Sequence, residues 1–369
     1  MLRIVHLDTG RDLRGGQWQL LLLARGLGKR GYEQRIVCPE GSALEVRARA
    51  EGFVVLSLRP CGLRKLSSML ALRREVRRDG FHVLHAHDGH GQTLSALASL
   101  GLSVRRVATR RVTFMPHGVG RSLGLHRLQY GSTCDAVVAV SRFIQDLLVR
   151  SGVAASKIEI IPDGIEIPAK LPDATLRARM RRQWGLDPEA FVIGHAGAFT
   201  HEKGQDTLLE AFLQAGGAVA GAQLLLAGEG PLRSAPKILG LLGQTRGCTR
   251  VLGWLEDLTP FFAALDLYVM PSRAEGLGSS VLLAMAHGLP VVASRVGGIP
   301  EVVEEARTGW LVPPASPSAL AEALAAAASD RERLRRLGAC ARERAREFSD
   351  DTMVNRTEAL YSRLTSARG

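Results

Sequence analysis

Residues 271–294 read PSRAEGLGSSVLLAMAHGLPVVAS, and this stretch decides which fold the chain adopts. An apolar run, Leu267–Met270, precedes it, a helix-period apolar run covers Val281–Ala286, and a second apolar run, Val291–Ala293, follows a Gly-Leu-Pro turn. This order of strand, glycine loop, helix and strand is typical of a parallel α/β sheet. The loop aims a helix N-terminus, with its unpaired N–H groups, at whatever lies above the strand ends, and such a position attracts anions.

Two glycines and a carboxylate occupy the loop itself. Gly276 and Gly278 would let a phosphate approach the backbone closely, although the same spacing also fits a plain tight turn. Glu275 favours the interpretation as a ligand site. Its carboxylate would repel a phosphate unless it faced a different, hydroxyl-rich part of the same ligand.

The segment resembles the signature of the retaining glycosyltransferase family 4, whose members share the two-domain GT-B fold. That signature reads roughly Pro-Ser-x-x-Glu-Gly-x-Gly, four further residues, and Glu-Ala-Met-Ala-x-Gly-x-Pro-Val-Val-Ala. The resemblance implies that Glu275 lies near the transferred sugar, as the first family glutamate does. The second family glutamate holds the ribose of the nucleotide, and this chain has Leu283 at that position. The predicted grip on the nucleotide is therefore altered.

Short apolar strands alternate with helical patterns along most of the chain. Strands are expected at residues 3–7, 34–38, 54–57, 83–86, 106–109, 136–140 and 158–161, and then at 191–195, 223–227, 267–270 and 291–293. Such alternation predicts parallel sheets covered by helices on both faces, with ligands bound beyond the carboxyl ends of the strands. Residues 162–188 are rich in proline and charge and are expected to form a linker that contains one helix near 175–184.

The fold expected from this pattern and the resemblance is α/β of the GT-B type, with two Rossmann-like parallel-sheet domains facing a central cleft. We expect an acceptor-side domain over residues 1–165 and a nucleotide-sugar-binding domain over residues 166–350. Residues 351–369 are expected to form a C-terminal helix that packs back on the first domain.

Composition and cysteine usage favour a cytoplasmic protein. The 369 residues are 46% apolar, which is enough for two hydrophobic cores. The five cysteines are widely spaced and include no Cys-x-x-Cys pair, so neither a disulfide framework nor a cysteine zinc site is indicated. The first residues enter a strand directly, and no apolar run reaches the roughly 18 residues of a membrane span. We expect a cytoplasmic protein, at most peripheral on the inner face of the plasma membrane.

Positive charge is confined to the first half of the chain. Residues 1–170 hold 26 lysines and arginines against 14 aspartates and glutamates, whereas the remaining residues hold 22 of each. Codon bias toward arginine would not confine the excess to one half, so we favour an anionic partner, either a membrane surface or the acceptor. The expected contact is the basic cluster within residues 63–78, although a core-packed helix with a solvated basic face fits the same pattern. Its members are Arg64, Lys65, Arg73, Arg74, Arg77 and Arg78. Nucleic acid is not indicated, because no basic motif is interleaved with aromatic residues.

A set of glycines and one lysine completes the predicted donor site. Gly15-Gly16 follows the first strand and opens a helix, where the resemblance places the donor diphosphate or sugar, although a flexible loop fits equally well. Lys203 matches the lysine of the family motif Gly-Arg-x-x-x-x-Lys-Gly, with a solvated surface lysine as the alternative, while Ala198 replaces the motif's arginine. The predicted donor contacts are Gly15, Gly16, Lys203, Gly228, Gly230, Gly253, Gly276, Leu277, Gly278, Ser279 and Leu283.

Histidines and an arginine stand at strand ends of the first domain. His85 and His87 are two residues apart on a strand and point the same way, so a metal site is conceivable, but the sequence identifies no third ligand. The resemblance instead places this loop beside the acceptor. Arg111 occupies the position of a histidine that many family members carry beside the reacting centre, and a surface ion pair is the alternative. The predicted catalytic residues are Glu275, Arg111 and His87.

The resemblance implies a glycosyltransferase that moves a sugar from a nucleoside diphosphate sugar to a hydroxyl with retention at the anomeric carbon. The donor is a substrate, and no cofactor is expected. Because the chain has no Asp-x-Asp triplet, we expect no metal and assign the diphosphate charge to Lys203 and backbone amides. Cell-envelope glycan or lipopolysaccharide synthesis, on an acceptor that could be lipid-linked, is the expected setting. A non-catalytic relative that binds a nucleotide-sugar or a partner is the alternative, motivated by Ala198 and Leu283.

Overall fold

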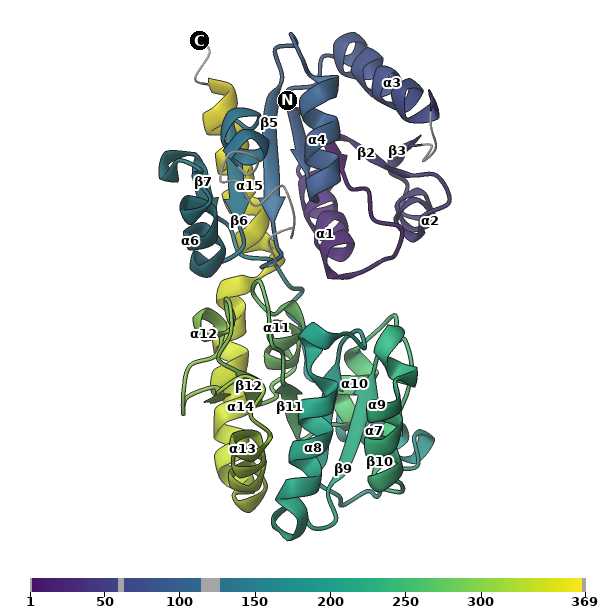
Figure 1. Ribbon diagram of the computed structural model, residues 1–369, viewed down its shortest axis with the longest axis vertical. Coiled ribbons are helices and arrows are strands. Elements are labelled where there is room, and N and C mark those ends of the chain that lie inside the picture. Colours follow the sequence, from purple (N-terminus) through teal and green to yellow (C-terminus); the bar gives the residue numbers. More distant parts are fainter. Residues whose placement is uncertain (1, 59–62, 114–126, 367–369) are drawn as a thin grey trace. The chain divides into compact units, whose positions relative to one another are not determined.

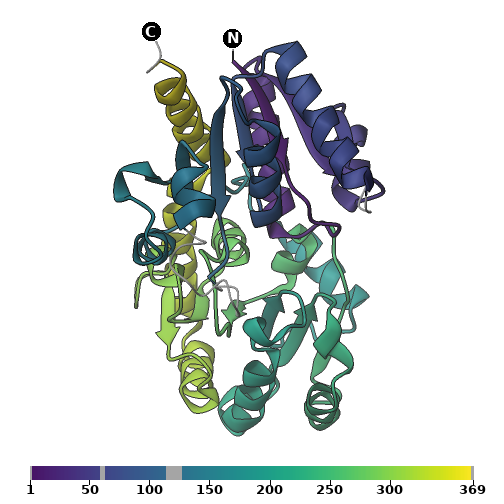
Figure 2. The ribbon, with the colours of Figure 1, turned by 45° about the horizontal axis from the view of Figure 1, so that its top comes forward.

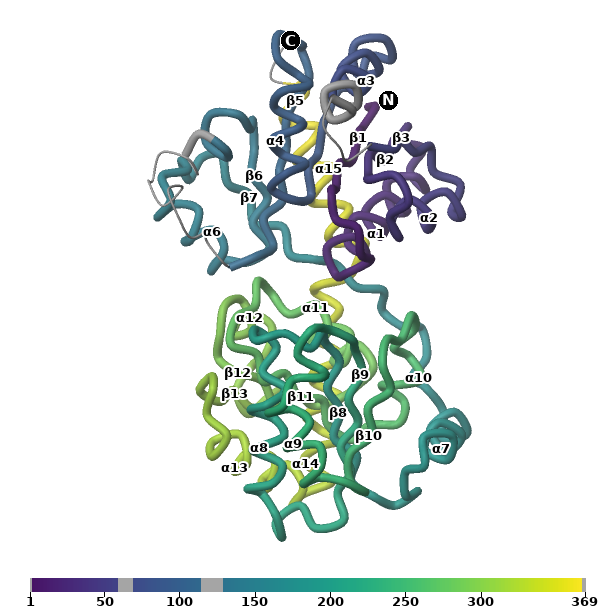
Figure 3. Tube along the Cα trace, turned by 45° about the vertical axis from the view of Figure 1, so that its right-hand side comes forward, coloured from purple at the N-terminus to yellow at the C-terminus, as the bar shows by residue number. Residues whose placement is uncertain are grey.

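The computed structural model describes residues 2–58, 63–113 and 127–366, except for the side chains of residues 63–68 and 127–128. The chain divides into two compact units. The first comprises Met1–Gly164 together with Asp350–Gly369, and the second comprises Ile165–Ser349. Figure 1 labels the elements of both units, and Figure 3 traces the Cα path through them.

The first unit is built on a seven-stranded sheet in which every neighbouring pair is parallel. Its spatial order is β3-β2-β1-β4-β5-β6-β7. The strands are β1 (Arg3–Leu7), β2 (Glu33–Pro39), β3 (Val54–Leu58), β4 (Val83–Ala86), β5 (Arg105–Arg110), β6 (Ala136–Ala139) and β7 (Ile158–Ile160). All seven lie within two residues of the strands predicted from the sequence.

Helices cover both faces of this sheet. They are α1 (Gly15–Lys29), α2 (Ala43–Ala50), α3 (Leu63–Asp79), α4 (Gly89–Ala98), α6 (Arg142–Arg150) and α15 (Asp350–Ser366), with the short helices η2 (Arg127–Ser132) and η3 (Ala155–Lys157). Successive residues of a strand point to opposite faces. Ile4 accordingly packs with Leu23 of α1 and Tyr361 of α15, whereas Val5 packs on the other face with Leu72 of α3. His6 shares the α1 and α15 side with Ile4, because it lies two residues further along β1.

The C-terminal helix α15 is an integral part of the first unit, and Figure 2 shows it running beside that unit's strands. Val354 and Tyr361 are fully buried in the core that α1 also lines. Glu358 accepts hydrogen bonds from Tyr32 and Arg30. A Cβ added at Gly26 of α1 would clash with the Val354 side chain, so a glycine lets the two helices approach closely.

The second unit has a six-stranded parallel sheet in the order β10-β9-β8-β11-β12-β13. Its strands are β8 (Val192–Ala196), β9 (Gln223–Ala227), β10 (Thr249–Val251), β11 (Leu267–Met270), β12 (Val291–Ser294) and β13 (Gly309–Val312). The sequence pattern predicted four of these. It missed β10 and β13, the two edge strands of this sheet, in which all three residues of β10 and the middle two of β13 are only partly buried.

Helices again lie on both faces. They are α7 (Ala174–Gln183), α8 (Gln205–Ala215), α9 (Pro236–Gln244), α10 (Thr259–Ala264), α11 (Ser279–Ala286), α12 (Ile299–Val302), α13 (Pro317–Ser329) and α14 (Arg331–Ala345), with η4 (His201–Lys203), η5 (Gly216–Val219), η6 (Pro231–Ser234) and η7 (Arg346–Phe348). Val269 joins the core formed with α8 and α13, while Tyr268 packs edge-on against Phe262 of α10.

One sequence expectation needs adjustment at the level of elements. Residues 165–188 of the segment expected to be a linker belong to the second unit, where Arg181 of α7 is buried and pairs with Asp266 at 2.8 Å. Among the described residues, no helix is both long and apolar enough to cross a bilayer. Two Rossmann-like parallel-sheet units of the expected class are present.

Gly26→Ala tests the packing of α15 on α1. We expect it to lower the free energy of unfolding of the first unit by about 1–3 kcal/mol, because the added methyl group overpacks the contact with Val354. Gly28→Ala is the matched control, since it gives the same helix a methyl group whose nearest neighbour is 3.5 Å away. Urea unfolding of both variants measures the difference, and equal stabilities would contradict close packing at Gly26.

Candidate functional site

In each sheet the first strand lies between two strands that come later in the chain. The chain therefore continues to one side of the first strand and later to its other side. In the first unit β1 lies between β2 and β4, and in the second β8 lies between β9 and β11. At such a switch point the loops beyond the carboxyl ends diverge and leave a crevice where α/β proteins bind ligands. The predicted site residues of each unit lie in or near these loops.

In the second unit the structure brings Lys203 and Glu275 into direct contact. Lys203 Nζ lies 2.5 Å from Glu275 Oε1, and the Ser272 hydroxyl donates to the same oxygen at 2.9 Å. The two side chains are only 28% and 10% exposed. Lys203 comes from the loop after β8 and Glu275 from the loop after β11. A cation and a carboxylate that the sequence separates by about seventy positions therefore form one polar centre.

Backbone packing fixes these two loops against each other. A Cβ at Gly204 would clash with the carbonyl oxygen of Pro271, and one at Gly297 would clash with the carbonyl oxygen of Glu275. Both glycines have positive φ, at 66° and 53°, which disfavours other residues. The Arg273 amide also donates to the Glu202 carbonyl at 2.7 Å. The position of Glu275 is thus set by the backbone on both sides of the loop.

Arg273, two residues before Glu275, holds the loop to α8. Its Nη1 and Nη2 donate to the two carboxylate oxygens of Asp206 at 2.9 Å, and Nη1 also donates to the His201 carbonyl. This bidentate pairing holds the pKa of Asp206 well below its ordinary value against the effect of burial. Arg273 therefore ties α8 to the loop that carries Glu275.

Three predicted donor contacts are glycines with structural reasons of their own. Gly228, Gly230 and Gly253 all have positive φ. A Cβ at Gly228 would clash with the carbonyl oxygen of Gly197, and one at Gly230 would lie 2.6 Å from the carbonyl oxygen of Phe199. The loops after β8, β9 and β10 pack backbone to backbone at this edge. Their part in donor binding remains a prediction.

The loop leading into α11 has the geometry expected of a helix N-terminus. Gly278 is the N-cap with φ 98°, Ser279 is the first helical residue, and Gly276 and Leu277 are buried. Leu283 lies one turn after Ser279 on the same face and is only partly buried, in contrast to its neighbours in the core. A partly buried leucine thus stands where the resemblance places a ribose carboxylate.

In the first unit, Gly15 and Gly16 open α1 without any steric need for glycine. Neither has a positive φ, and a Cβ at either position would meet no atom within 4 Å. Gln17 reaches back to accept a hydrogen bond from the Arg14 amide and donates to Asp8 at 2.8 Å. The open space above the two glycines suits a ligand that approaches the backbone.

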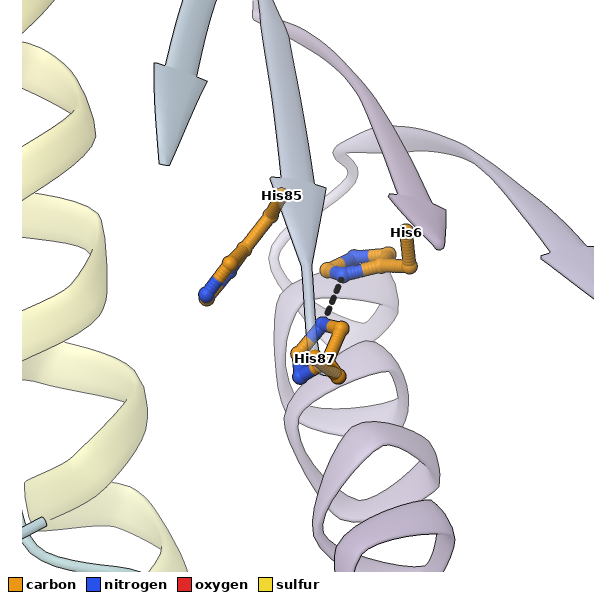
Figure 4. A group of neighbouring side chains, drawn as sticks. All are labelled: His6, His85 and His87. Atoms are coloured by element: carbon orange, nitrogen blue, oxygen red, sulfur yellow. Dashed lines mark hydrogen bonds between the residues drawn. The ribbon is translucent and has the colours of Figure 1, made fainter. Parts of the chain in front are cut away.

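A third histidine corrects the sequence analysis of the His85 and His87 pair. His6 on β1 is the register partner of His85 on β4, and the three rings form a buried group (Figure 4). One nitrogen from each ring lies within 4.8 Å of the others, so a three-histidine set for a metal exists among the described residues. The sequence had identified only two members, because the third comes from a neighbouring strand.

Hydrogen bonds already engage these rings. His85 contacts the Tyr361 hydroxyl and the Thr109 hydroxyl, each at 2.6 Å, and His6 contacts His87 at 3.1 Å. Burial lowers the pKa of His6 to about 4 and lowers the pKa values of His85 and His87 well below the ordinary range. The group is therefore neutral at pH 7 and would have to exchange some of these bonds to hold a cation.

Arg111 lies beside this group. Its Nε donates to Asp163 Oδ1 at 2.8 Å, and its Nη1 is 3.5 Å from His87 Nδ1. Arg111 thus forms an ion pair, as the alternative expected, but the pair is largely buried, since the two side chains are only 14% and 7% exposed. Asp8 lies close enough to feel this cation, although burial and then the charge of Asp88 raise its pKa. The carboxyl ends of β1, β4, β5 and β7 thus carry an arginine, carboxylates and a histidine together.

Sequence reasoning missed His6, Gln34 and Asp8. Each looks like an ordinary polar residue in or after a strand, and no motif marks it. The signal that existed was the polar side chain of His6 within the otherwise apolar run Ile4–Leu7, which a strand buried on both faces does not require. Only the register of β1 against β4 shows what His6 faces.

Two family models match the chain. One, described as glycosyl transferases group 1, covers residues 190–330, and the other, described as Glycosyltransferase Family 4, covers residues 13–167. A Mycobacterium tuberculosis protein named GDP-mannose-dependent alpha-(1-6)-phosphatidylinositol monomannoside mannosyltransferase is 30% identical over 356 residues, with 89% of this chain and 90% of that protein covered. A D-inositol 3-phosphate glycosyltransferase from Xylanimonas cellulosilytica is 31% identical over 69% of this chain and 62% of that protein.

Solved structures share the fold. Anabaena Alr3699/HepE in complex with UDP has a TM-score of 0.88 at 21% identity, with 98% of this chain and 100% of that chain covered. Sucrose-phosphate synthase from Thermosynechococcus elongatus has a TM-score of 0.82 at 22% identity, with both chains covered completely. These likenesses establish the GT-B fold for the chain.

Acid should destabilise the first unit through its buried histidines. The unfolded chain takes up a proton on each histidine below about pH 6.5, whereas folded His6, with a pKa of about 4, does not. Stability is therefore full above pH 6.5 and falls as the pH drops toward 4. At pH 5 the contribution lost from His6 is about 2 kcal/mol. Urea unfolding at pH 7 and pH 5 measures the loss.

The variant His6→Gln separates this contribution from other acid effects. It should lower the pH dependence of the unfolding free energy by about the amount assigned to His6. His90→Asn is the control, because His90 is exposed on α4 and its replacement should leave that dependence unchanged. An equal pH dependence in the wild type and His6→Gln would show that His6 is not held neutral in the folded protein.

Proposed function

This chain belongs to glycosyltransferase family 4, and we propose that it transfers a sugar, with retention, from a nucleoside diphosphate sugar to a hydroxyl of a cell-envelope acceptor. The observation that carries the proposal is the contact of Lys203 with Glu275 at the switch point of the second sheet. The contact places a cation for a leaving diphosphate beside a carboxylate for sugar hydroxyls. The two groups neutralise each other until a donor separates them.

The proposed role of Glu275 is to orient the transferred sugar, and that of Lys203 is to stabilise the diphosphate that leaves. When the donor binds, the phosphate oxygens replace Glu275 as the partner of Lys203, and Glu275 becomes available to sugar hydroxyls. Positive charge that is fixed before reaction lowers the barrier because it needs no rearrangement as the leaving group develops its charge. The amides around Gly278 and Ser279, at the start of α11, add their dipoles.

We propose that no metal ion takes part. The leaving diphosphate would meet the ammonium group of Lys203 and the N-terminus of α11, while Gly15 and Gly16 stay proposed donor contacts of the first unit. Ala198 supplies none of the positive charge that an arginine would add there. Lys203 is therefore proposed to neutralise more of the charge of the leaving diphosphate. Leu283 offers the ribose an apolar surface, and the nucleotide is proposed to be held by its diphosphate and base more than by its ribose hydroxyls.

Retention is proposed to follow from the donor itself. A phosphate oxygen on the leaving side accepts the proton of the acceptor hydroxyl while that hydroxyl attacks the same face of the anomeric carbon. The new glycosidic bond forms as the sugar–phosphate bond breaks, and the nucleoside diphosphate leaves with the proton. No side chain is required as a nucleophile.

Arg111 and His87 are the proposed acceptor-side residues. Arg111 is a cation held at the strand ends of the first unit, and relatives are named for inositol phosphate and phosphatidylinositol mannoside acceptors. An acceptor that carries a phosphate fits this cation. The basic excess of residues 1–170 is consistent with an acceptor presented at an anionic membrane.

A second candidate function has its own observation. Leu283 and Ala198 stand at two positions where the family signature has charged residues, and a non-catalytic relative that binds nucleotide-sugars or a partner would tolerate both changes. Binding without turnover would favour this candidate.

A donor screen followed by two variants tests the proposed function. A nucleoside diphosphate sugar that binds the folded protein should raise its Tm, and the same donor should support transfer. Glu275→Gln should lower kcat by more than it weakens nucleotide binding, because the carboxylate contacts only the sugar. Transfer at an undiminished rate by Glu275→Gln would rule out its role.

Lys203→Ala should weaken binding of the nucleoside diphosphate by about tenfold, because a hydrogen bond to a charged group contributes about 1.5–3 kcal/mol. Lys237→Ala is the control, since Lys237 also pairs with carboxylates, Asp206 and Glu210, but is 58% exposed on α9. Calorimetry measures both. Equal affinities for the two variants would remove the diphosphate role of Lys203.

Liposome binding tests the proposed membrane contact at α3. In the described part of that helix Arg74 and Arg77 are exposed and Leu70 is 52% exposed, whereas Arg73 donates to the carbonyls of Ala98 and Leu100. Arg78 pairs with Asp79, and the side chains of Arg64 and Lys65 lie outside the described residues.

We expect Arg74→Gln/Arg77→Gln to lower binding to anionic vesicles several-fold at low salt, because each exposed cation near such a surface contributes about 1 kcal/mol. Binding of the wild type should also weaken as salt rises, since screening shortens the range of exposed charges to about 8–10 Å. Equal co-sedimentation of the wild type with neutral and anionic vesicles would contradict the membrane contact and favour an acceptor that diffuses freely in solution.

A further inference from the structure

We propose that a buried hydrogen-bond chain running from Gln34 through His6 and His87 holds the guanidinium of Arg111 in one orientation. Gln34 and His6 are then positioning residues, which act on the acceptor side of the reaction without touching substrate. The catalytic purpose of the chain rests on the proposed function, whereas its existence and polarity rest on geometry alone.

The polarity of the chain is decided at Gln34 on β2. Its Nε2 donates to the carbonyl of Ala24 in α1 at 2.9 Å. The amide oxygen therefore faces the other way and lies 3.0 Å from His6 Nε2. Because an amide oxygen can only accept, His6 must carry its proton on Nε2.

The same logic passes to the next ring. A neutral His6 protonated on Nε2 presents a lone pair on Nδ1, and this atom lies 3.1 Å from His87 Nε2, as the dashed line in Figure 4 marks. His87 must then donate from Nε2 and keep a lone pair on Nδ1. Burial favours the neutral form of both rings by lowering their pKa values.

The lone pair of His87 reaches Arg111. Nη1 of Arg111 lies 3.5 Å from His87 Nδ1, a long hydrogen bond, and Nε donates to Asp163 at 2.8 Å. A planar guanidinium that is held at two of its nitrogens has one orientation. If the chain ran in the opposite sense, His87 would direct an N–H at the N–H of Arg111, and the two donors would repel each other.

His85 lies outside the chain although its ring is only 4.2 Å from that of His87, centroid to centroid. Its two nitrogens contact Tyr361 of α15 and Thr109 of β5. Removing the Tyr361 hydroxyl should disturb His85 without changing which atom of His6 or His87 carries the proton. Tyr361→Phe is therefore a matched control in the same buried group.

Nitrogen-15 NMR of the full-length protein, labelled on histidine and arginine, reads the chain directly. In the wild type we expect His6 and His87 both to be protonated on Nε2, and the Nε–H of Arg111 to exchange slowly with water. Gln34→Met keeps the size of the side chain but removes its acceptor. It should change the tautomer of His6 and His87, speed the exchange at Arg111 at least several-fold, and lower kcat/KM about 3–30-fold.

His6→Leu removes the next link and should have the same effect on His87 and Arg111, so one of the two variants suffices if the other fails to fold. Tyr361→Phe should leave both tautomers and the Arg111 exchange as in the wild type. A wild-type His87 protonated on Nδ1 would overturn the proposed hydrogen-bond chain, whether or not transferase activity can be assayed.

Activity separates the two levels of the proposal. If the Nε–H of Arg111 exchanges faster in Gln34→Met while kcat/KM is unchanged, the positioning role is overturned and the transferase function stands. A wild type that turns over no donor, yet shows the expected tautomers and their change in Gln34→Met, would refute the proposed function and uphold the chain as the element that orients Arg111.

Discussion

Parallel pairing of the first strand of each unit with two neighbours is the constraint on which the rest of this structure depends. Right-handed crossovers carry the chain from β1 to β2 on one side and later to β4 on the other, and the same happens around β8. The loops after β1 and β4, and after β8 and β11, therefore end side by side. Every polar centre described above, from His6 and His87 to Lys203 and Glu275, follows from that adjacency.

The two units use this adjacency for different electrostatic purposes. In the second unit, Lys203 and Glu275 form a compact ion pair. A charged ligand can separate the two groups by binding each of them with a different part of itself. In the first unit, the buried histidines are neutral, and the fixed charges are those of Arg111, Asp163 and the aspartates nearby.

Polar groups in the core of the first unit are tolerated because their hydrogen bonds are made within the protein. An unsatisfied buried imidazole would be costly, whereas His85 and His6 each have partners on both nitrogens. Tyr361 supplies one of these partners from the last helix, so α15 supports the polar group beneath the strand ends as well as the apolar core. The C-terminus of the chain is thereby tied to residues at its beginning.

The sequence by itself determined the α/β class, the parallel sheets, most strands and the importance of the loop at Glu275. These features are local, since they depend on short apolar periods, glycine spacing and the residues that flank them. It also indicated, through the family resemblance, that the chain is a glycosyltransferase. The sequence did not predict β10 and β13, which are edge strands and only partly buried.

The tertiary structure alone decided which side chains meet. The pairing of Lys203 with Glu275, the burial of Arg111 with Asp163, and the arrival of His6 beside His85 all depend on strand order and register, which are set by packing between distant segments. Arg273 illustrates the same point, because it lies two residues before Glu275 in the sequence and yet pairs with Asp206 of α8. The direction of a side chain depends on its neighbours in space. Local sequence patterns do not show which distant segments supply those neighbours.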